Sequence, residues 1–299
     1  MKHTSKLLKQ LRITGLLLFT AATSCYTYAQ ETRTDDEIDL LLDELFFSEE
    51  QLIDDLLASL NKNHFLYSSF TLNSNTYFSG RDSGIDQFNF YPQLTYYHPS
   101  GFNMSLSGLY YENFDPNWDF TNVSLGYFQN IDEKEQFYFN AGYTRYFFSD
   151  GSDFFTNSVD LSLGVRNKNK TFGTALYTSY LFGSDNALQM IFSTYGRLTL
   201  LKAKAFQLKF RPQANFLVAQ QTIALQELNS QSQQTELVNY DVFALLNTQL
   251  NLPISLVSKS WNVDVGYSIN FPRAVATETD LKTNGFFTIS LGYLVEFKK

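Results

Sequence analysis

The chain has 299 residues and a formal net charge of −8 at pH 7, with 44% hydrophobic and 17% aromatic residues. This acidic balance, without a basic face, argues against nucleic acid as a partner, because nucleic-acid binding depends on clustered Lys and Arg. Beyond the N-terminal segment there is no apolar run of 18 or more residues, so ordinary transmembrane helices are not predicted.

Residues 1–29 have the pattern of a secretory signal peptide. A basic start is followed by a short apolar stretch at 13–22 and by small residues before a predicted cleavage site after Ala29. A lipoprotein signal is the alternative, since residues 22–25 form a loose lipobox that would place a lipid on Cys25. Cleavage after Ala29 removes the only cysteine and with it any disulfide chemistry.

Residues 30–63 are predicted to form an acidic, amphipathic, helical segment in the periplasm. They contain eleven of the 30 Asp and Glu residues of the chain. Between 35 and 61, apolar residues recur at three- and four-residue steps with acids between them, which predicts two short helices. The segment could be a solvated extension, a docking element for a periplasmic or membrane partner, or a plug.

From His64 onward, apolar residues recur at every second position, which is typical of β-strands. Pro92 and Pro212 lie inside predicted strands, where each removes a backbone donor, so a bulge or weakened pairing is expected there. About twelve strands are predicted, each long enough to cross a bilayer at the tilt of a barrel. They lie near 65–78, 87–97, 102–111, 119–129, 136–148, 154–166, 171–182, 188–200, 206–219, 238–252, 261–271 and 285–297.

The last predicted strand, 285–297, has the most informative pattern. Its apolar residues fall on one face, and small or polar residues fall on the other, with Leu294 as the exception. Such a strand suits a wall that has lipid outside and water inside. It resembles the C-terminal strand of bacterial outer-membrane β-barrels, which closes the barrel and is recognised by the barrel-assembly machinery. By this resemblance Tyr293, Val295 and Phe297 would form the assembly signal.

The resemblance extends over 64–299 and includes the Tyr- and Asn-rich strands and the signal end at 28–30, which are similar to those of Bacteroidota-like porins. It implies an all-β fold, an antiparallel transmembrane β-barrel of about twelve strands in the outer membrane, and no characterised subfamily matches. The 29 Phe and 19 Tyr suit the aromatic girdles of such barrels. A soluble β-sandwich is the alternative, but it does not explain polar residues on the second face of nearly every strand.

The connections between predicted strands alternate in length, which predicts an orientation. Short connections, such as 98–101, would be periplasmic turns, and longer ones, such as 220–237 and 272–284, would be external loops. An even number of strands returns the C-terminus to the periplasm. The polar segment 226–235 is expected to be a mobile external loop.

If the apolar faces meet lipid, the opposite faces line the lumen and carry charged residues. Because unpaired buried charge is costly, these side chains are expected to pair or to be hydrated. They would form either an internal salt-bridge network or a charged constriction that selects solutes. The predicted lumen charges are Asp160, Arg197, Lys209, Arg211, Asp241, Asp264 and Glu296.

Six tyrosines are predicted on the same lumen face. They could crowd the bore or form an aromatic track for a sugar. The tyrosines are Tyr91, Tyr97, Tyr138, Tyr146, Tyr177 and Tyr195.

Enzymes built on such barrels combine Ser or Asp with His. The histidines here are His3 in the signal, His64 at the start of the first strand and His98 in a predicted periplasmic turn, so none is placed to serve an external active site. No catalytic residue, metal site or cofactor is predicted. The sequence predicts a porin-like channel for small polar solutes. The alternative is a non-conducting accessory barrel that binds partners through 35–61.

Overall fold

The computed structural model describes most of the chain after residue 63, and of residues 221–228 and 235–242 it describes the backbone alone. The predicted signal peptide, Cys25 and the predicted helices of 35–61 lie outside the described residues. In the part of the chain that is described, no helix is long and apolar enough to cross a membrane. The described residues are 64–82, 86–228, 235–258, 260–275 and 278–297.

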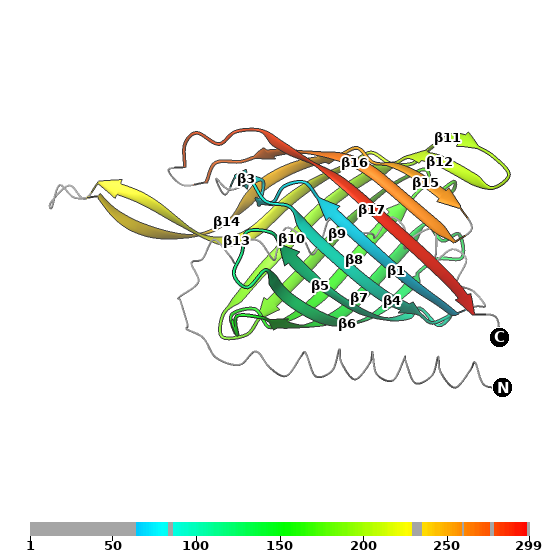
Figure 1. Cartoon of the computed structure of the whole chain (residues 1–299), viewed down its shortest axis with the longest axis horizontal. Helices are drawn as coiled ribbons and strands as arrows, with labels where there is room; N and C mark the ends of the chain where they lie inside the picture. The colour runs from blue at the N-terminus through cyan, green and yellow to red at the C-terminus, as the bar shows by residue number, and fades with distance from the viewer. Residues whose placement is uncertain (1–63, 83–85, 229–234, 259, 276–277, 298–299) are drawn as a thin grey trace, which may run out of the picture. The chain divides into compact units, whose positions relative to one another are not determined.

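Antiparallel β-strands form one closed barrel (Figure 1). A separate hairpin consists of β2 (Tyr77–Phe78) and β3 (Arg81–Asp82). The strands of the barrel are β1 (His64–Asn73), β4 (Asn89–Tyr97), β5 (Phe102–Tyr111), β6 (Trp118–Asn130), β7 (Phe137–Phe148), β8 (Asn157–Arg166), β9 (Phe172–Phe182), β10 (Asn186–Gly196), β11 (Leu198–Lys202), β12 (Phe206–Phe210), β13 (Gln213–Leu228), β14 (Thr235–Asn251), β15 (Ile254–Ser258), β16 (Trp261–Pro272) and β17 (Asn284–Phe297).

The wall has twelve crossings, because β10 with β11, β12 with β13, and β14 with β15 each form one interrupted crossing. The strand β17 pairs with both β16 and β1 and so closes the ring. The predicted all-β barrel of about twelve strands is therefore confirmed. The closing register places His64 opposite Phe297. We call the end of the barrel that contains these two residues the terminal end, and the opposite end the loop end.

Two of the three interruptions contain a proline, which lacks a backbone donor. One separates β12 from β13 at Pro212, as the sequence predicts, and another separates β14 from β15 at Pro253. The backbone N–H of Arg211 donates to the carbonyl of Pro253 at 3.1 Å, so neighbouring crossings stay joined at this level. At Pro92 the pairing of β4 with β5 skips from Phe90 to Gln93, which confirms the weakened pairing expected there.

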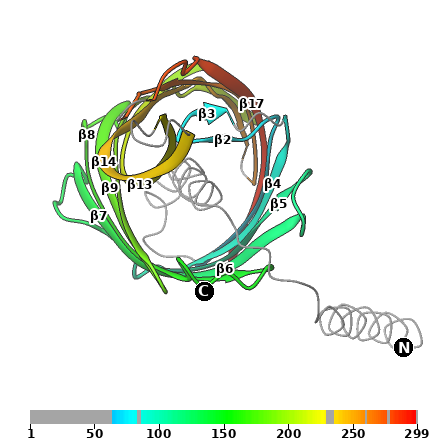
Figure 2. The ribbon, with the colours of Figure 1, turned by 90° about the vertical axis from the view of Figure 1, so that its left-hand side faces the viewer.

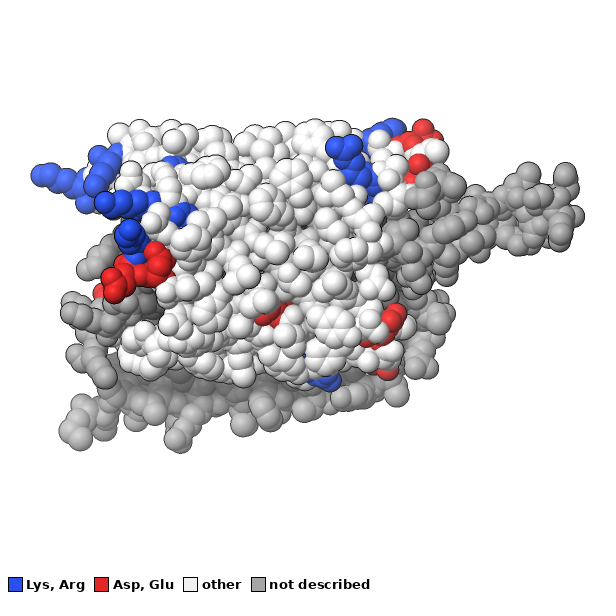
Figure 3. Space-filling model, turned by 180° about the vertical axis from the view of Figure 1, so that it is seen from behind, with Lys and Arg blue, Asp and Glu red and all other residues white. Residues whose placement is uncertain are grey.

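Apolar residues face outward from the barrel. On β17, Phe287 and Ile289 are 61% and 52% exposed, whereas Ser290 is 7% exposed. The apolar exception, Leu294, packs against buried residues on the inner side. On the face seen in Figure 3, charged side chains gather toward the two ends of the barrel and few lie between them. A closed barrel with such an apolar belt is a transmembrane β-barrel of the outer-membrane type.

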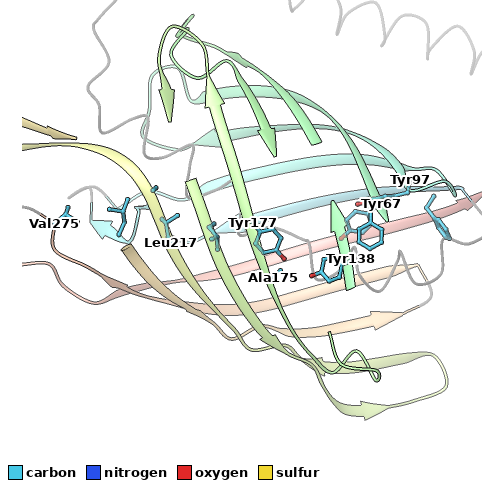
Figure 4. Packing of buried hydrophobic residues seen from close by; sticks show 12 residues of the cluster. Tyr67, Tyr97, Tyr138, Ala175, Tyr177, Leu217 and Val275 are labelled. Atoms are coloured by element: carbon cyan, nitrogen blue, oxygen red, sulfur yellow. The ribbon is translucent and has the colours of Figure 1, made fainter. Parts of the chain in front are cut away.

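Large aromatic side chains pack along the inner face of the wall. Buried residues extend along the barrel from Tyr97 and Tyr67 to Leu217 and Val275 (Figure 4). Where a ring needs room, the neighbouring strand supplies a glycine, and a Cβ at that glycine would overlap the ring. The pairs are Tyr67 over Gly292, Tyr138 over Gly164, and Tyr195 over Gly173.

The predicted loop 220–237 is wrong over much of its length. The strand β13 continues to Leu228 and β14 begins at Thr235, and the two strands pair throughout this stretch. Beyond Ala219 and Asn247 the described sheet gives neither strand a second neighbour. The hairpin therefore leaves the barrel as a two-stranded arm at the loop end (Figure 1).

The predicted strand 65–78 is too long, because the wall strand ends at Asn73. Asn75 Oδ1 accepts hydrogen bonds from the backbone N–H groups of Thr76 (2.8 Å) and Gln87 (3.0 Å). A side chain that bonds nearby backbone groups in this way favours a turn over a continued strand. The chain after Asn73 therefore forms the β2–β3 hairpin instead of extending the wall.

Candidate functional site in the barrel lumen

The inner face of the wall is the candidate site, because a solute that crosses a barrel meets its lumen side chains and its loops. Three of the predicted lumen charges lie together on one side of the wall. Register pairs Lys209 with Ser255 and Ser255 with Asp264, so these side chains share one face of adjacent strands. Arg211 follows β12 directly and is 3% exposed. Arg197 lies on the neighbouring crossing, at the break between β10 and β11.

The remaining predicted charges lie apart from this group. Glu296 is exposed at the terminal end, opposite Phe65 in the closing seam. The backbone places Asp241 in the arm, opposite Thr222, and its side chain lies outside the described residues. These two acids therefore do not share the level of Asp264.

Asp160 lies on β8, two to three crossings along the wall from these bases, and hydroxyl groups surround its carboxylate. Ser158 Oγ donates to it at 2.8 Å, Ser179 Oγ donates at short range, and Thr144 Oγ1 lies 3.5 Å away. Hydroxyl donors from three neighbouring strands can hold an ionised carboxylate without a basic partner. This arrangement differs from the salt-bridge network that the sequence suggests as one possibility.

Arg166 is an inward-facing charge that the sequence analysis misses. Its side chain is 2% exposed, donates to the carbonyl of Glu135 (2.7 Å) and to Asn130 Oδ1 (2.9 Å), and lies over the ring of Tyr138. It occupies the last position of a predicted strand, on the same alternate face as Asp160. The alternation alone could therefore have identified it.

A row of amide side chains crosses the lumen face between β13 and β17. Register joins Asn215 to Gln249, Gln249 to Asn270, and Asn270 to Asn284. Their near neighbours on alternate positions of β13 and β14 are amides as well. We call this set the amide belt: Gln213, Asn215, Asn247, Gln249, Asn251, Asn270 and Asn284.

Hydrogen bonds between neutral groups hold the amide belt together. Asn270 Oδ1 accepts from Gln249 Nε2 (2.9 Å) and from Asn247 Nδ2 (3.0 Å). Asn270 Nδ2 in turn donates to Asn284 Oδ1 at 3.0 Å. The central amide, on β16, thus fixes the orientation of its neighbours on β14 and β17.

Several atoms of the amide belt are left without a hydrogen-bond partner among the described residues. They are the donor Asn215 Nδ2 and the acceptors Asn247 Oδ1, Gln249 Oε1 and Asn251 Oδ1. The side chains of Asn215, Asn247 and Gln249 are 2%, 1% and 5% exposed. A buried polar group without a partner costs about 1–3 kcal/mol, so this part of the wall favours any molecule that supplies hydrogen bonds.

Two loop segments fold over the amide belt at the loop end. Arg81 Nε and Nη2 donate to the two carboxylate oxygens of Glu278 at 2.7 and 2.9 Å, which ties the segments together. Asn284 Nδ2 donates to the carbonyl of Gly80 at 2.6 Å, and a Cβ at Gly80 would lie 2.5 Å from the side chain of Asn247. Figure 2 shows β2 and β3 inside the ring of strands. We call these segments the cap, consisting of 74–82 and the described part of 273–283.

Glu278 is the ionisable group that holds the cap. Burial raises the pKa of its carboxyl, but hydrogen bonds from Arg81 and from the backbone N–H of Val275 outweigh this effect. The pKa of Glu278 therefore lies below its ordinary value, and the carboxylate stays ionised at neutral pH.

The described histidines lie together at the terminal end. His64 Nδ1 is 2.5 Å from the hydroxyl of Tyr96, and the ring of His64 is 4.9 Å from that of His98. Within the part of the chain that is described, no group of three or more His, Cys, Asp and Glu is arranged to hold a metal ion.

No protein-family model matches the chain. A search of curated proteins found no match. Among solved structures, the chain is similar to the NanC porin (9% identity, TM-score 0.46) and the KdgM porin (10% identity, TM-score 0.45), with 77% of this chain and 98% of each porin covered. It is also similar to the translocator domain of the autotransporter NalP from Neisseria meningitidis, at 12% identity and TM-score 0.44, over 86% of this chain and 96% of that one. These likenesses are too distant to carry an activity or a solute over to this chain.

Proposed function

We propose that the protein is a porin-like channel of the outer membrane through which small polar solutes diffuse. The division of the wall carries this proposal: residues such as Phe287 and Ile289 face outward, and polar residues such as Asn215 and Ser290 face inward. A polar lumen inside an apolar wall allows water and hydrophilic solutes to cross a bilayer. Lipid surrounds the apolar belt in this proposal.

In the proposed channel, the terminal end faces the periplasm. The closing strand then carries the signal for the barrel-assembly machinery at Tyr293, Val295 and Phe297. The three charges Lys209, Arg211 and Asp264 form a charged constriction near this end, together with Arg197. Glu296 lies outside this constriction, exposed at the terminal end. Such a constriction favours ions and solutes of one sign.

The experiment is the electrical conductance of the purified full chain in planar bilayers. We expect stepwise currents, and in a salt gradient we expect the double variant Lys209→Gln with Arg211→Gln to shift the reversal potential toward cation selectivity. Lys134→Gln is the matched control, because Lys134 is exposed in the turn between β6 and β7. An absence of stepwise current from the folded barrel would contradict the channel, and equal shifts in both variants would contradict the constriction.

A non-conducting accessory barrel is the second candidate. The packing of Tyr97, Tyr138 and Tyr195 on the inner face favours it, since each is 5% exposed or less and reduces the space for solutes. In this case the chain would bind a periplasmic partner through residues 35–61. Co-purification with and without residues 31–62 tests it, and partners that are unchanged after truncation would count against it. We propose no catalytic role, because His64 and His98 both lie at the terminal end.

A further inference from the structure

We infer that the amide belt is a binding site for neutral, polyhydroxylated solutes, such as sugars, on their way through the lumen. The inference rests on the proposed channel function and adds the chemical class of the solute. It starts from the free polar atoms of Asn215, Asn247, Gln249 and Asn251, none of which has a partner among the described residues.

The free atoms of the amide belt match hydroxyl groups better than charged groups. Asn215 Nδ2 is a donor and Gln249 Oε1 is an acceptor, and these two residues pair across β13 and β14. A hydroxyl group donates and accepts, so adjacent hydroxyls of one sugar can satisfy both atoms. A carboxylate accepts only, and it would bring its negative charge against the oxygens of Asn247, Gln249 and Asn251.

The amide belt is also ordered before any solute arrives. Asn270 binds Gln249, Asn247 and Asn284 at 2.9–3.0 Å, which fixes these side chains in one arrangement. A site whose groups are already held loses little conformational freedom on binding. Weak but selective binding is what a diffusion channel requires, since a solute must enter the site and leave it.

The opposite part of the wall lacks this combination. On β6, Asn122 Oδ1 already accepts a hydrogen bond from Ser107 Oγ at 2.6 Å, and Tyr91 donates to the same serine at 2.8 Å. The carboxylate of Asp160 is likewise supplied by hydroxyl donors. Most polar groups there bind one another, with Asn140 Oδ1 on β7 as an exception, whereas the amide belt leaves four such atoms on the adjacent strands β13 and β14.

The cap controls access to the amide belt from the loop end. Gly80 lies against Asn247, accepts a hydrogen bond from Asn284 and is buried, so the cap covers the loop-end side of the belt in this structure. A solute that enters from this end must displace the cap, which Arg81 and Glu278 hold. Weakening this contact should raise the rate of sugar association and leave the dissociation rate unchanged.

The test measures sucrose binding in two ways on the full chain. The first is the block of single-channel current by sucrose, compared with glucuronate. The second is NMR saturation transfer from the detergent-solubilised barrel to sucrose protons, which needs no current. The variant is Asn215→Leu with Gln249→Leu, which removes one free donor and one free acceptor. It also removes the hydrogen bonds from Gln213 to Asn215 and from Gln249 to Asn270. Asn122→Leu is the matched control on the opposite part of the wall.

We expect the double variant to weaken sucrose binding about tenfold in both measurements, because each net hydrogen bond contributes a few-fold in affinity. We expect Asn122→Leu to change it less than about twofold. If the double variant does not fold, as judged by heat-modifiable gel mobility, Gln249→Leu alone should give about a threefold loss.

Three results would overturn the inference. In the first, sucrose neither blocks the current of the wild-type channel nor shows saturation transfer. In the second, Asn122→Leu weakens sucrose binding as much as the double variant does. In the third, the double variant changes cation selectivity while sucrose binding stays intact. The last result would assign the amide oxygens to cations instead. The wild-type barrel could carry no current and still show saturation transfer to sucrose that the double variant loses. This result would support the binding site and contradict the channel.

Discussion

Two parts of the barrel wall are built differently. In the regular wall, from β4 to β9, crossings are single strands, and β6 pairs with β7 without a break from Phe120 opposite Phe148 to Asn130 opposite Tyr138. In the interrupted wall, from β10 to β16, three successive crossings are split and two splits contain proline. The regular wall includes the ring of Tyr138 packed over Gly164, and the interrupted wall carries most of the amide belt and the cluster around Asp264.

The difference shows where binding capacity resides in this barrel. Most polar groups of the regular wall bind each other, as the hydroxyls around Asp160 do, and Asn140 Oδ1 is an exception. The interrupted wall leaves Asn215 Nδ2 and Gln249 Oε1 without partners among the described residues. Departures from local regularity tend to coincide with functional sites, because the fold can tolerate a few of them where they are useful.

Adding volume to the regular wall should have the largest effect. Gly164→Val would drive a branched side chain into the ring of Tyr138. We expect a loss of about 2–3 kcal/mol in the free energy of unfolding, measured by urea titration. Combining it with Tyr138→Ala should recover part of the loss, since the two residues contact each other. Purely additive losses would show that the ring and the glycine do not depend on one another.

Breaking the ion pair of the cap should have the next largest effect. The side chains of Arg81 and Glu278 are 13% and 11% exposed, so Arg81→Gln leaves a mostly buried carboxylate without its partner. We expect the cap to lose about 2 kcal/mol of local stability, measured by hydrogen exchange of its amides.

A second ion pair, between Lys170 and Glu135, serves as the control for this variant. Lys170 and Glu135 are 25% and 30% exposed in the turns at the terminal end, and Lys170→Gln should cost less than about 1 kcal/mol. Equal effects of Arg81→Gln and Lys170→Gln on the cap would contradict the role assigned to Arg81.

Acid should loosen the cap and leave the regular wall in place. Because the folded-state pKa of Glu278 lies below its ordinary value of 4.5, the stabilisation is fully present above that value. It is lost as pH falls through the lower pKa of the folded protein. The protection of the Val275 amide against hydrogen exchange, relative to an unfolded peptide at the same pH, should therefore fall below about pH 4. In Glu278→Gln the same amide should show no such pH dependence, and persistence of the acid effect in that variant would assign it to another group.

Removing the arm should have the smallest effect. Gln220 pairs with Phe243, so an Asn-Gly turn can replace residues 221–242 and keep the wall intact. We expect a change below about 0.5 kcal/mol in barrel stability, because beyond this rung the arm pairs only with itself in the described sheet. A larger loss in urea titration would show that the arm supports the interrupted wall.

The regular wall could be predicted from alternation alone. Each of its strands begins and ends within a few residues of the predicted range, and Phe287 and Ile289 on the closing strand face outward as expected. Period-two patterns carry this information because one face meets lipid and the other meets the lumen. The break at Pro212 was also predictable, since proline removes a ladder donor.

The interrupted wall was harder to predict, for physical reasons. The arm was expected to be a loop because Gln, Ser and Asn dominate its tip and leave no alternation to detect. Asn215, Gln249 and Asn270 lie on polar faces of predicted strands, but only the register brings them into one row. Cross-strand register depends on pairing between distant segments, which one sequence does not specify. The contact between Arg81 and Glu278 joins loops 197 residues apart and leaves no local signal.

The seam between β1 and β17 closes the barrel, and only a covalent link between these two strands is missing from a circular chain. It joins Asn73 to Thr288 across 215 residues, through a side-chain hydrogen bond at 2.7 Å, and His64 lies opposite Phe297. Closure can therefore occur only after the whole barrel sequence has been made. A permuted chain, with 64 linked to 297 and new ends opened in the turn 98–101, would keep every cross-strand pair. It would place the assembly signal in the interior of the chain. Assembly of this permuted chain would therefore test whether the signal must be C-terminal, while the barrel itself can still close.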